Sequence, residues 1–339
     1  MRIFVTGASG YIGRALCRRL AAEGHQVIAL VRRTSRVEPL VEAGVETTFG
    51  DVTDRASLRE GMSGADWVVH AAAELDLAAP PARMEAVNVG GTDNVAALAH
   101  KLGVGRFLSV SSVAWWGGSP DDGSEITEDS PALTPLPTRY SSTKHEAEVR
   151  VQEYARRGLA VNTVYPSLVY GPPGKKEGAN ALLRLLDLGR FPALIGGEKK
   201  TSWIFLDDLV EAMVRILGGA APPGRHFILA GDVATIEEVA RRVHALGGAR
   251  PPRLRLSVPA ARLLFRAMTP FWKLAGRRPP VPIEQLNSIA RHWAFADERA
   301  RRELGWRPRA LDVGLPATLD YLRRDEAAHP TRRVQDTPR

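Results

Sequence analysis

The chain has 339 residues, 44% of them hydrophobic and 25% charged, which is the balance of an ordinary globular protein with room for one large or two average domains. The net charge is +8, but the basic residues are mostly arginines scattered as pairs, without the dense basic run and interleaved aromatics of a nucleic-acid-binding surface, so we expect no nucleic-acid partner. Cys17 is the only cysteine, which excludes an intramolecular disulfide and a cysteine-based zinc site.

The chain opens with a predicted strand, a glycine turn and a helix. Residues 3–5 form a short apolar run, Gly7, Gly10 and Gly13 follow at three-residue spacing, and a helical run begins at Ala15. In this context the glycines allow a tight turn, let backbone approach a pyrophosphate and let the helix pack on the strand. Free N–H groups at the helix N-terminus then bind the pyrophosphate. Three glycines can also form a turn without a ligand, but we predict a dinucleotide-binding turn here.

The start of the sequence also indicates where in the cell the protein is expected. The first predicted strand, residues 3–5, stands at the start of the sequence, so we expect no signal peptide before it, and no stretch reaches the ~18 uncharged apolar residues of a transmembrane helix. We therefore expect a cytoplasmic protein.

The end of the second predicted strand, residues 25–31, is informative for the choice of cofactor. An acidic residue about 20 positions after the glycines binds the ribose hydroxyls of NAD, whereas an arginine accommodates the 2′-phosphate of NADP. The sequence has no acid there, and Arg32, Arg33 and Arg36 follow the strand. Because a planar guanidinium suits a phosphate, we favour NADP(H) over NAD(H), the alternative being solvated surface arginines.

Strands and helices alternate through the first half of the chain. We predict strands at 45–49, 67–70, 107–110 and 160–165 and helices at 55–62, 88–102 and 140–157. Repeated strand–helix units predict a parallel, doubly wound sheet, in which ligands bind outside the carboxyl ends of the strands.

Two of these strand ends are candidates for cofactor contact. Asp51, after the third strand, either caps the next helix or meets the adenine. Ala71, Ala72 and Ala73 follow the fourth strand, and such small residues let backbone approach a cofactor. His70, at the end of the same strand, is interpreted as a packed rather than a catalytic histidine.

Tyr140 and Lys144 carry the sharpest chemical signal. Residues four apart lie on one face of a helix, and an ammonium beside a phenol lowers the tyrosine pKa from its ordinary value of about 10. Tyr140 can then exchange a proton at neutral pH. A strand ending in Ser111 and Ser112 precedes this helix, so the glycine turn, the serines and the tyrosine all lie at carboxyl ends of strands.

The second half has a looser pattern. Helices are predicted at 182–188, 209–217, 235–246, 297–304 and 314–323, and strands at 203–206 and 226–229. Thr235 and Glu238 have the spacing of a capping box. Residues 324–339 are polar and without pattern, and are predicted to be a disordered tail.

Several motifs together resemble the extended short-chain dehydrogenases/reductases. They are TGASGYIG (6–13), GDVTD (50–54), HAAA (70–73), NVGGTDNV (88–95), SVSSVAWWG (109–117), YSSTK (140–144), PSLVYGP (166–172) and WIFLDDL (203–209). The resemblance implies an α/β fold, a Rossmann doubly wound parallel sheet with a smaller, mostly C-terminal α/β substrate-binding domain. It assigns 1–166 to the dinucleotide-binding domain, with 203–230 returning to it, and 167–202 and 231–323 to the substrate-binding domain.

The resemblance also implies roles for the motif residues, and no metal. Tyr140 becomes the general acid/base, Lys144 the residue that lowers its pKa and binds the nicotinamide ribose, and Ser112 the partner of the substrate oxygen. Asn88 becomes a structural or water-organising residue. The implied cofactor-binding residues are Gly7, Ser9, Gly10, Tyr11, Ile12, Gly13, Arg32, Arg33, Arg36, Asp51, Val52, Ala71, Ala72, Ala73, Tyr140, Lys144, Pro166 and Val169.

Within this family, three departures count against nucleotide-sugar enzymes. Arg32 stands where the NAD-using sugar enzymes generally carry an acid, Val113 and Ala114 where dehydratases carry acidic groups, and Thr201 and Ser202 where many have an arginine for the diphosphate. The sequence is more similar to the branch of 3β-hydroxysteroid dehydrogenases, dihydroflavonol reductases and long-chain β-keto acid reductases.

This similarity predicts an NADP(H)-dependent oxidoreductase that interconverts a ketone and a secondary alcohol on a small hydrophobic substrate, steroid-, flavonoid- or β-keto acyl-like. The alternatives are an NAD-dependent nucleotide-sugar epimerase and a non-catalytic dinucleotide-binding regulator.

Three tryptophans and one segment leave alternatives open. Trp115 and Trp116 line the substrate pocket or form a packed loop corner, and Trp203 is a further pocket candidate. Residues 257–282 alternate apolar and basic side chains, which is typical of ordinary packing, of a lid over an apolar pocket or of contact with a membrane surface, packing being favoured. The resemblance adds a homodimer through the helices that follow the fourth and fifth strands.

Overall fold

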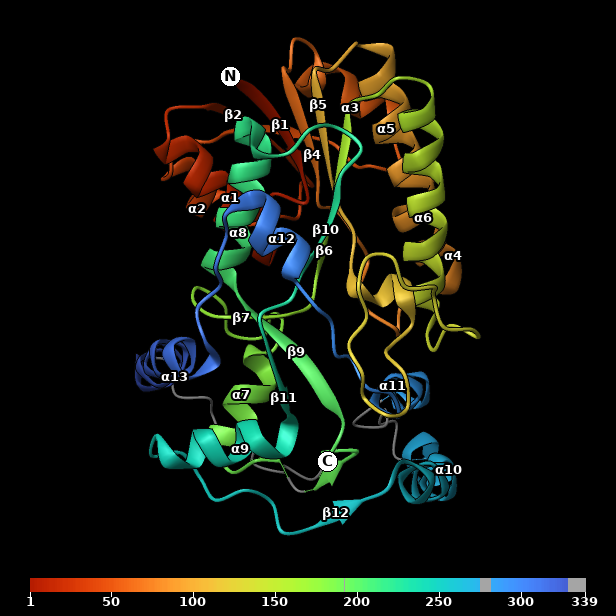
Figure 1. Ribbon diagram of the computed structural model, residues 1–339, viewed down its shortest axis with the longest axis vertical. Coiled ribbons are helices and arrows are strands. Elements are labelled where there is room, and N and C mark those ends of the chain that lie inside the picture. The colour runs from red at the N-terminus through yellow and green to blue at the C-terminus, as the bar shows by residue number, and fades with distance from the viewer. Residues whose placement is uncertain (192, 275–281, 329–339) are drawn as a thin grey trace.

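A seven-stranded sheet forms the larger part of the molecule in the computed structural model, which describes residues 1–191, 193–274 and 282–328 (Figure 1). All seven strands are parallel. Their order is β10 (His226–Leu229), β6 (Val161–Pro166), β5 (Arg106–Val110), β4 (Trp67–His70), β1 (Arg2–Thr6), β2 (Gln26–Val31) and β3 (Glu46–Phe49). The predicted parallel, doubly wound sheet is confirmed.

The strand order reverses beside β1. The chain first adds β2 and β3 on one side, then crosses over and adds β4, β5, β6 and β10 on the other. In the β1–β4 pair, Thr6 lies opposite His70, so the two strands end side by side. Their carboxyl ends flank the topological switch point, which is where sheets of this type bind ligands.

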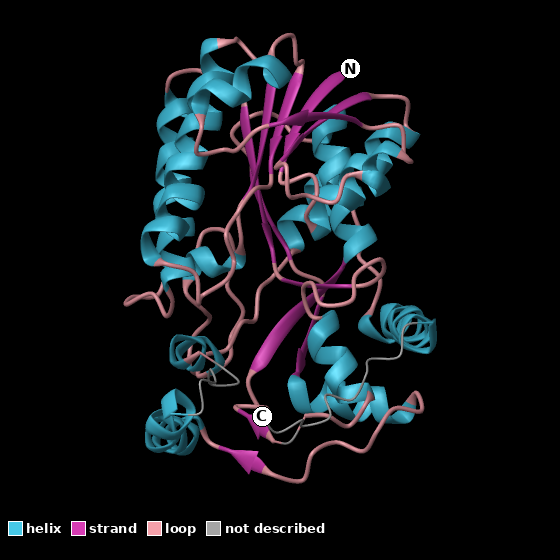
Figure 2. Ribbon diagram, turned by 180° about the vertical axis from the view of Figure 1, so that it is seen from behind, coloured by secondary structure: helices cyan, strands magenta, loops and turns pink. Residues whose placement is uncertain are grey.

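Helices cover both faces of this sheet (Figure 2). One face carries α1 (Tyr11–Ala22), α2 (Glu38–Val41), α8 (Leu206–Arg215) and α12 (Glu298–Leu304), and the other α3 (Arg55–Met62), α5 (Gly91–Lys101) and α6 (Arg139–Arg156). Each face has its own hydrophobic core, because side chains alternate along a strand. In β1, Ile3 and Val5 pack into the first core and Phe4 into the second.

The smaller part lies beyond the carboxyl ends of the large sheet (Figure 1). It contains the sheet β11 (Asp232–Thr235), β9 (Lys200–Phe205) and β7 (Leu168–Tyr170), the pair β12 (Arg255–Leu256) and β8 (Leu194–Ile195), and the helices α7 (Asn180–Asp187), α9 (Ile236–Ala245), α10 (Val258–Leu274), α11 (Ile283–Ile289) and α13 (Leu311–Ala328). Short connecting helices are α4 (Pro81–Glu85), η1 (Ala86–Gly90), η2 (Val113–Trp116) and η3 (Ile216–Ala220).

The segment that returns to the larger part begins later in the chain than predicted. The sequence predicts that this segment starts at Trp203, but Trp203 lies in β9 of the smaller sheet. The return begins with α8, which packs on α1, and continues to β10 at the edge of the large sheet. A strand pattern alone cannot say which of two sheets a strand joins.

The C-terminal helix is longer than predicted. The sequence predicts a disordered tail from residue 324, but α13 continues to Ala328. Its last turns are held by ion pairs that Asp325 and Glu326 form with basic side chains of the smaller part. Residues 329–339 of the predicted tail lie outside the described part of the chain. None of the described helices is both long and apolar enough to cross a bilayer.

Candidate active site

The glycine turn between β1 and α1 is packed so tightly that two of its positions tolerate no side chain. Gly7 has φ +70°, and a Cβ added there would lie 2.5 Å from the carbonyl carbon of Ala71. A Cβ on Gly13 would lie 2.2 Å from the Gly7 carbonyl oxygen. The Gly10 N–H donates to that same oxygen at 3.0 Å and closes the turn. This arrangement fits a turn that brings backbone against a pyrophosphate.

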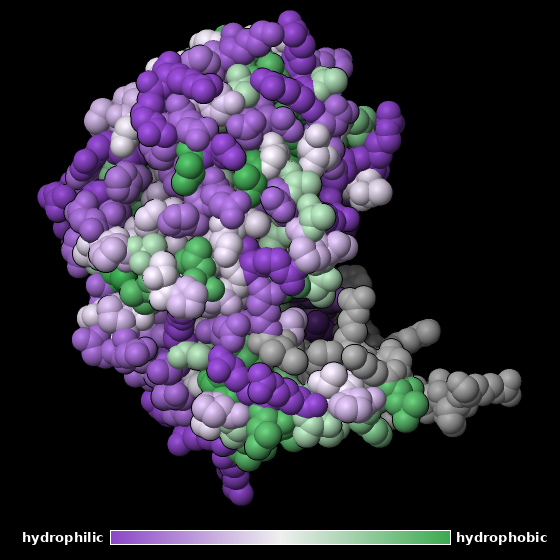
Figure 3. Space-filling view, turned by 90° about the vertical axis from the view of Figure 1, so that its right-hand side faces the viewer, coloured by the Kyte–Doolittle hydropathy of each residue, from purple (hydrophilic) through white to green (hydrophobic). Residues whose placement is uncertain are grey.

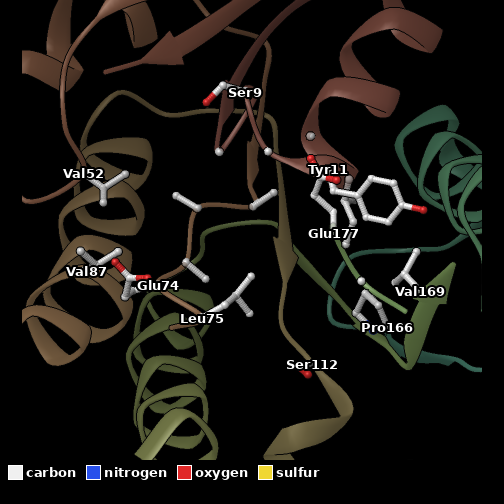
Figure 4. A pocket seen from close by; sticks show the side chains of 18 of the residues that line it. Ser9, Tyr11, Val52, Glu74, Leu75, Val87, Ser112, Pro166, Val169 and Glu177 are labelled. Carbon is white, nitrogen blue, oxygen red and sulfur yellow. The ribbon is translucent and has the colours of Figure 1, made fainter. Parts of the chain in front are cut away.

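A cavity of about 740 Å³ extends from this turn along the carboxyl ends of the strands (Figure 4). It has the size of a small-molecule site. Most of the residues expected to bind the cofactor line it: Gly7, Ser9, Gly10, Tyr11, Ile12, Gly13, Arg32, Asp51, Val52, Ala71, Ala72, Ala73, Tyr140, Pro166 and Val169. Ser112 lines it as well. Arg33, Arg36 and Lys144 are not among the lining residues.

The three arginines after β2 have different surroundings. Arg32 lines the cavity. The guanidinium of Arg33 lies over the ring of Phe49, 5.3 Å from its centroid. Arg36 is 81% exposed and pairs with Glu38. Arg32 is therefore the only one of these three that the structure brings to the cavity.

Ser35 is a lining residue that the sequence analysis missed. Its hydroxyl accepts the Arg32 N–H at 3.2 Å and the Ser9 hydroxyl at 3.2 Å, so it joins the end of β2 to the glycine turn. A serine in an arginine-rich segment carries no signal of its own in the sequence.

Asp51 does not cap the helix that follows it. The N-cap of α3 is Asp54, whose carboxylate accepts the Ala56 N–H. The Asp51 carboxylate instead accepts the N–H and the hydroxyl of Thr53, each at 2.9 Å, while the residue lines the cavity. The structure thus excludes the capping interpretation of Asp51.

Ser112 and Tyr140 meet in the cavity. Tyr140 is the second residue of α6, whose N-cap is Thr138, and Ser112 is the N-cap of η2. Ser112 and Tyr140 lie close enough for the serine hydroxyl to act on the phenol. Burial raises the pKa of Tyr140 to about 12, and interaction with the Ser112 hydroxyl opposes this rise by favouring the phenolate. The pKa is thus raised, not lowered by Lys144 as the sequence predicts, because burial outweighs the other influences, and the phenol is protonated at neutral pH.

Lys144 lies one turn further along α6, behind the cavity wall. Its ammonium donates to the Val110 carbonyl oxygen at 3.0 Å. Burial lowers the pKa of Lys144 to about 8, and the nearby Glu148 carboxylate acts in the opposite direction. The ammonium is thus held in place by the last residue of β5, the strand that Ser112 follows.

Glu148 is a buried carboxylate that the sequence analysis did not consider. Its Oε1 accepts the Gln152 side-chain N–H at 2.8 Å and the Thr163 hydroxyl at 3.1 Å, and its Oε2 is buried without a partner in the described part of the chain. Burial raises its pKa, and these donors and Lys144 oppose the rise. Its position four residues after Lys144 is the signal that could have revealed it.

Asn88 and His70 have structural surroundings. The Asn88 side chain donates to the Thr143 hydroxyl at 2.9 Å and accepts the Glu74 N–H at 2.7 Å, which ties the loop after β4 to α6. His70 is hydrogen-bonded on both ring nitrogens by threonine hydroxyls, and burial lowers its pKa to about 3. A neutral, fully partnered ring agrees with the interpretation of His70 as a packed residue.

The three tryptophans lie in packed regions. Trp116 and Trp203 are 1% and 2% exposed, and their indole N–H groups donate to backbone carbonyls. Trp115 stacks on His145, with ring centroids 4.9 Å apart. None of the three lines the cavity, so the structure favours the packed-corner interpretation of Trp115 and Trp116.

A loop of the smaller part forms another wall of the cavity that the sequence did not reveal. Glu177 and Gly178 line the cavity, and Figure 4 shows Glu177 beside Tyr11. The Tyr11 hydroxyl donates to the Gly171 carbonyl oxygen, and the buried Asn180 side chain donates to the same oxygen at 2.7 Å. The cofactor side of the cavity is thereby tied to the smaller part.

The hydroxyl of Ser111 is a buried group without a hydrogen-bond partner in the described part of the chain, and this residue lines the cavity. A ligand in the cavity would satisfy it. The tight glycine turn, Arg32 and this unpartnered hydroxyl together fit a bound dinucleotide and substrate. In the described ranges no group of three or more His, Cys, Asp or Glu residues is arranged to hold a metal ion.

Comparison with known proteins agrees with this geometry. The model of the NAD dependent epimerase/dehydratase family matches residues 3–230. The 2-alkyl-3-oxoalkanoate reductase of Stenotrophomonas maltophilia is 30% identical, with 93% of this chain and 97% of that protein aligned. The 3-beta-hydroxysteroid dehydrogenase of Mycolicibacterium neoaurum is 26% identical, with 91% of this chain and 87% of that protein aligned.

The fold is likewise that of a solved structure. The crystal structure of gox2253 superposes with a TM-score of 0.82 at 27% identity, covering 95% of this chain and 98% of that one. The family match covers the whole of the large sheet, from β1 to β10, and the relatives align over nearly the full length. The chain therefore belongs to the NAD dependent epimerase/dehydratase family of extended short-chain dehydrogenases/reductases, as an NAD(P)-dependent oxidoreductase similar to the 3β-hydroxysteroid dehydrogenases.

Proposed function

We propose that the protein is an NADP(H)-dependent reductase of a hydrophobic ketone, which it converts to a secondary alcohol. The observation that carries the proposal is that Ser112 and Tyr140, which lie close enough to interact, both line a cavity that starts at the glycine turn. The relatives named as a 2-alkyl-3-oxoalkanoate reductase and a 3-beta-hydroxysteroid dehydrogenase act on carbonyl or hydroxyl groups of largely apolar molecules.

The residues of the site divide the chemistry between them. A bound nicotinamide supplies hydride to the substrate carbon or accepts it. The Ser112 hydroxyl and the Tyr140 phenol bind the substrate oxygen, and Tyr140 donates its proton as negative charge develops there. The protonated phenol is the form that donates this proton in ketone reduction, and the phenolate is the form that accepts it in alcohol oxidation. The Lys144 ammonium then stabilises the phenolate that remains.

Substitution of Tyr140 tests the proposal directly. We expect purified protein to oxidise NADPH in the presence of β-keto acyl, steroid, flavonoid or simple aromatic ketones. Tyr140→Phe removes the proton donor and should lower kcat by about 10²–10⁴-fold while cofactor binding is kept. Tyr154→Phe is the matched control, because this tyrosine lies on the same helix but bonds Asp93 away from the cavity.

The outcomes separate the proposal from its competitors. Turnover that persists in Tyr140→Phe would contradict the assigned mechanism. Thermal stabilisation by NAD together with a UDP-sugar, without turnover of any ketone, would indicate a nucleotide-sugar epimerase instead. Dinucleotide binding without any turnover would indicate a regulator.

Cofactor preference depends on Arg32. Arg32 lines the cavity at the end of β2, where the chain has no acidic residue. Arg32→Ala should raise KM for NADPH on the order of ten-fold, the loss of one charge-assisted hydrogen bond, and leave KM for NADH unchanged. Arg36→Ala is the control, because Arg36 is 81% exposed and pairs with Glu38. Equal effects on the two cofactors would contradict the preference for NADP(H).

A further inference from the structure

Helix α10 has an apolar side that the described part of the chain leaves exposed. Its inner side packs on α11, through buried Val258, Ala261 and Phe265 and partly buried Trp272. Four large apolar residues point away from this contact: Leu263 is 72% exposed, Leu264 46%, Phe271 62% and Leu274 89%. At 100° per residue these four positions fall within an arc of roughly 100°. The exposed residues therefore form one continuous stripe, which we call the outer stripe.

The outer stripe lies at one end of the molecule. Figure 1 places α10 at the end opposite the N-terminus, and Figure 3, which views the molecule from the side on which Figure 1 draws α10, shows hydrophobic side chains at that end. A soluble protein rarely leaves several large apolar side chains side by side in water, because each loses the free energy of burial. The stripe therefore needs a partner.

The charge of the surrounding chain limits what that partner can be. Between Glu238 and Glu284 the sequence has ten arginines or lysines and no aspartate or glutamate, although the whole chain has 38 acidic residues. Arg242 and Arg255 are paired with Asp312 and Glu237 from other segments. Arg266, on α10 itself, is exposed. The segment of the chain that carries the stripe is thus basic.

A second copy of the chain fits this surface poorly. In a two-fold symmetric contact the same patch faces itself, so the basic surroundings of the two stripes would oppose each other. An anionic lipid surface fits it well, because its acyl boundary accepts the apolar stripe and its headgroups attract arginine and lysine. The helix would lie on the bilayer, since no described helix is able to cross one.

The docked helix would be connected to the catalytic residue. Arg262 of α10 donates to the Asn287 side chain of α11 at 2.8 Å, and Asn287 donates to the Pro137 carbonyl oxygen at 3.2 Å. Glu284 at the start of α11 accepts the backbone N–H of Arg139. Arg139 directly precedes Tyr140, so α10 and α11 are fixed to the first turn of the catalytic helix.

We propose that the outer stripe of α10 docks the protein on an anionic lipid bilayer, and that its substrate is a ketone dissolved in that bilayer. The docking stands on the surface alone, whereas the substrate class rests on the proposed reductase function. Docking and turnover are therefore measured separately, so that failure of one is distinguishable from failure of the other.

Vesicle binding tests the docking. We expect the full-length protein to sediment with phosphatidylcholine vesicles that contain phosphatidylglycerol, and at least ten-fold less with vesicles of phosphatidylcholine alone. Leu263→Glu with Phe271→Glu should lower binding to the anionic vesicles at least ten-fold. Val313→Glu is the matched control, because Val313 is 63% exposed on α13 and lies outside the stripe. A milder variant, Arg266→Gln, should weaken binding measurably and is folded even if the double variant is not.

Three results would overturn the docking. The first is wild-type protein that stays in the supernatant with anionic vesicles. The second is an Arg266→Gln variant that sediments with these vesicles as the wild type does. The third is a vesicle-free dimer in sedimentation velocity that the Leu263→Glu substitution dissociates, which would assign the stripe to a second copy.

Turnover tests the substrate class. With a short, water-soluble ketone, Leu263→Glu should keep the NADPH oxidation rate of the wild type. With a long-chain ketone embedded in anionic vesicles, the same variant should lose at least ten-fold in rate. Equal loss with both substrates, or with neither, would contradict delivery from the bilayer.

Discussion

At the residue scale, Lys144 and Glu148 are two buried titratable groups next to the proposed catalytic tyrosine. Both are 6% exposed and stand four residues apart on α6. Burial lowers the pKa of Lys144 to about 8, and the nearby Glu148 carboxylate opposes this shift. Glu148 therefore favours the charged form of the Lys144 side chain. We infer that Glu148 is a positioning residue, since it does not line the cavity.

Glu148→Gln should move the pH dependence of the reaction in a defined direction. Without the carboxylate the ammonium is less stable, so the pKa of Lys144 falls below its value of about 8. The proton is then lost at lower pH, and the alkaline limb of the kcat profile should shift down by about one pH unit. Glu146→Gln, an exposed carboxylate on the same helix, should leave the profile unchanged. An unshifted limb in Glu148→Gln would show that its role is only structural.

The elements show what a local sequence pattern can and cannot determine. The glycine turn and the capping box of α9 were both predictable, because each is made by residues within a few positions of one another. The capping box is confirmed, with Thr235 accepting the Glu238 N–H at 3.1 Å and Glu238 accepting the Thr235 N–H at 2.7 Å. Ser35 and Asn180 were not predictable, because their roles depend on contacts with Ser9 and Gly171 that only the folded chain creates.

The glycine turn gives a prediction at this scale. Gly13→Ala places a Cβ 2.2 Å from the Gly7 carbonyl oxygen, and backbone cannot move aside as a side chain can. The turn must open, so we expect a loss of about 1–3 kcal/mol in unfolding free energy, measured by chemical denaturation, and weaker dinucleotide binding. Gly90→Ala is the control, since a Cβ there meets nothing within 4 Å and should be neutral or slightly stabilising. Unchanged cofactor affinity in Gly13→Ala would show that the turn does not bind the pyrophosphate.

At the scale of the whole molecule, the sequence predicted the doubly wound sheet because every strand–helix unit has its own pattern. The smaller part was harder to predict from the sequence, because it is built from several segments that are separated along the chain by segments of the larger part. A homodimer through α5 and α6 stays a prediction, to be tested by sedimentation velocity.

The chain crosses from α12 in the larger part to α13 in the smaller part through residues 305–310, and contacts of this crossing hold the two parts together.

Asp208, in α8 of the larger part, binds two residues of that crossing. Its carboxylate accepts the Arg309 guanidinium at 2.9 and 3.0 Å and the Arg309 N–H at 2.8 Å, and its carbonyl accepts the Trp306 indole N–H at 2.8 Å. The Arg309 guanidinium also lies over the ring of Phe205, 4.0 Å from its centroid. Asp208 is 8% exposed, so its charge is stabilised by Arg309 rather than by water.

Asp208→Asn should therefore loosen the joint between the two parts. The amide keeps the shape of the carboxylate but loses the charge-assisted hydrogen bonds, and the arginine left behind is 36% exposed and partly solvated. We expect the free energy of unfolding to fall by about 2 kcal/mol, measured by urea denaturation. Asp207→Asn, at the exposed neighbouring position, should change it by less than about 0.5 kcal/mol. If both variants lose the same stability, the ion pair does not hold the crossing, and packing of Trp306 against the core must do so instead.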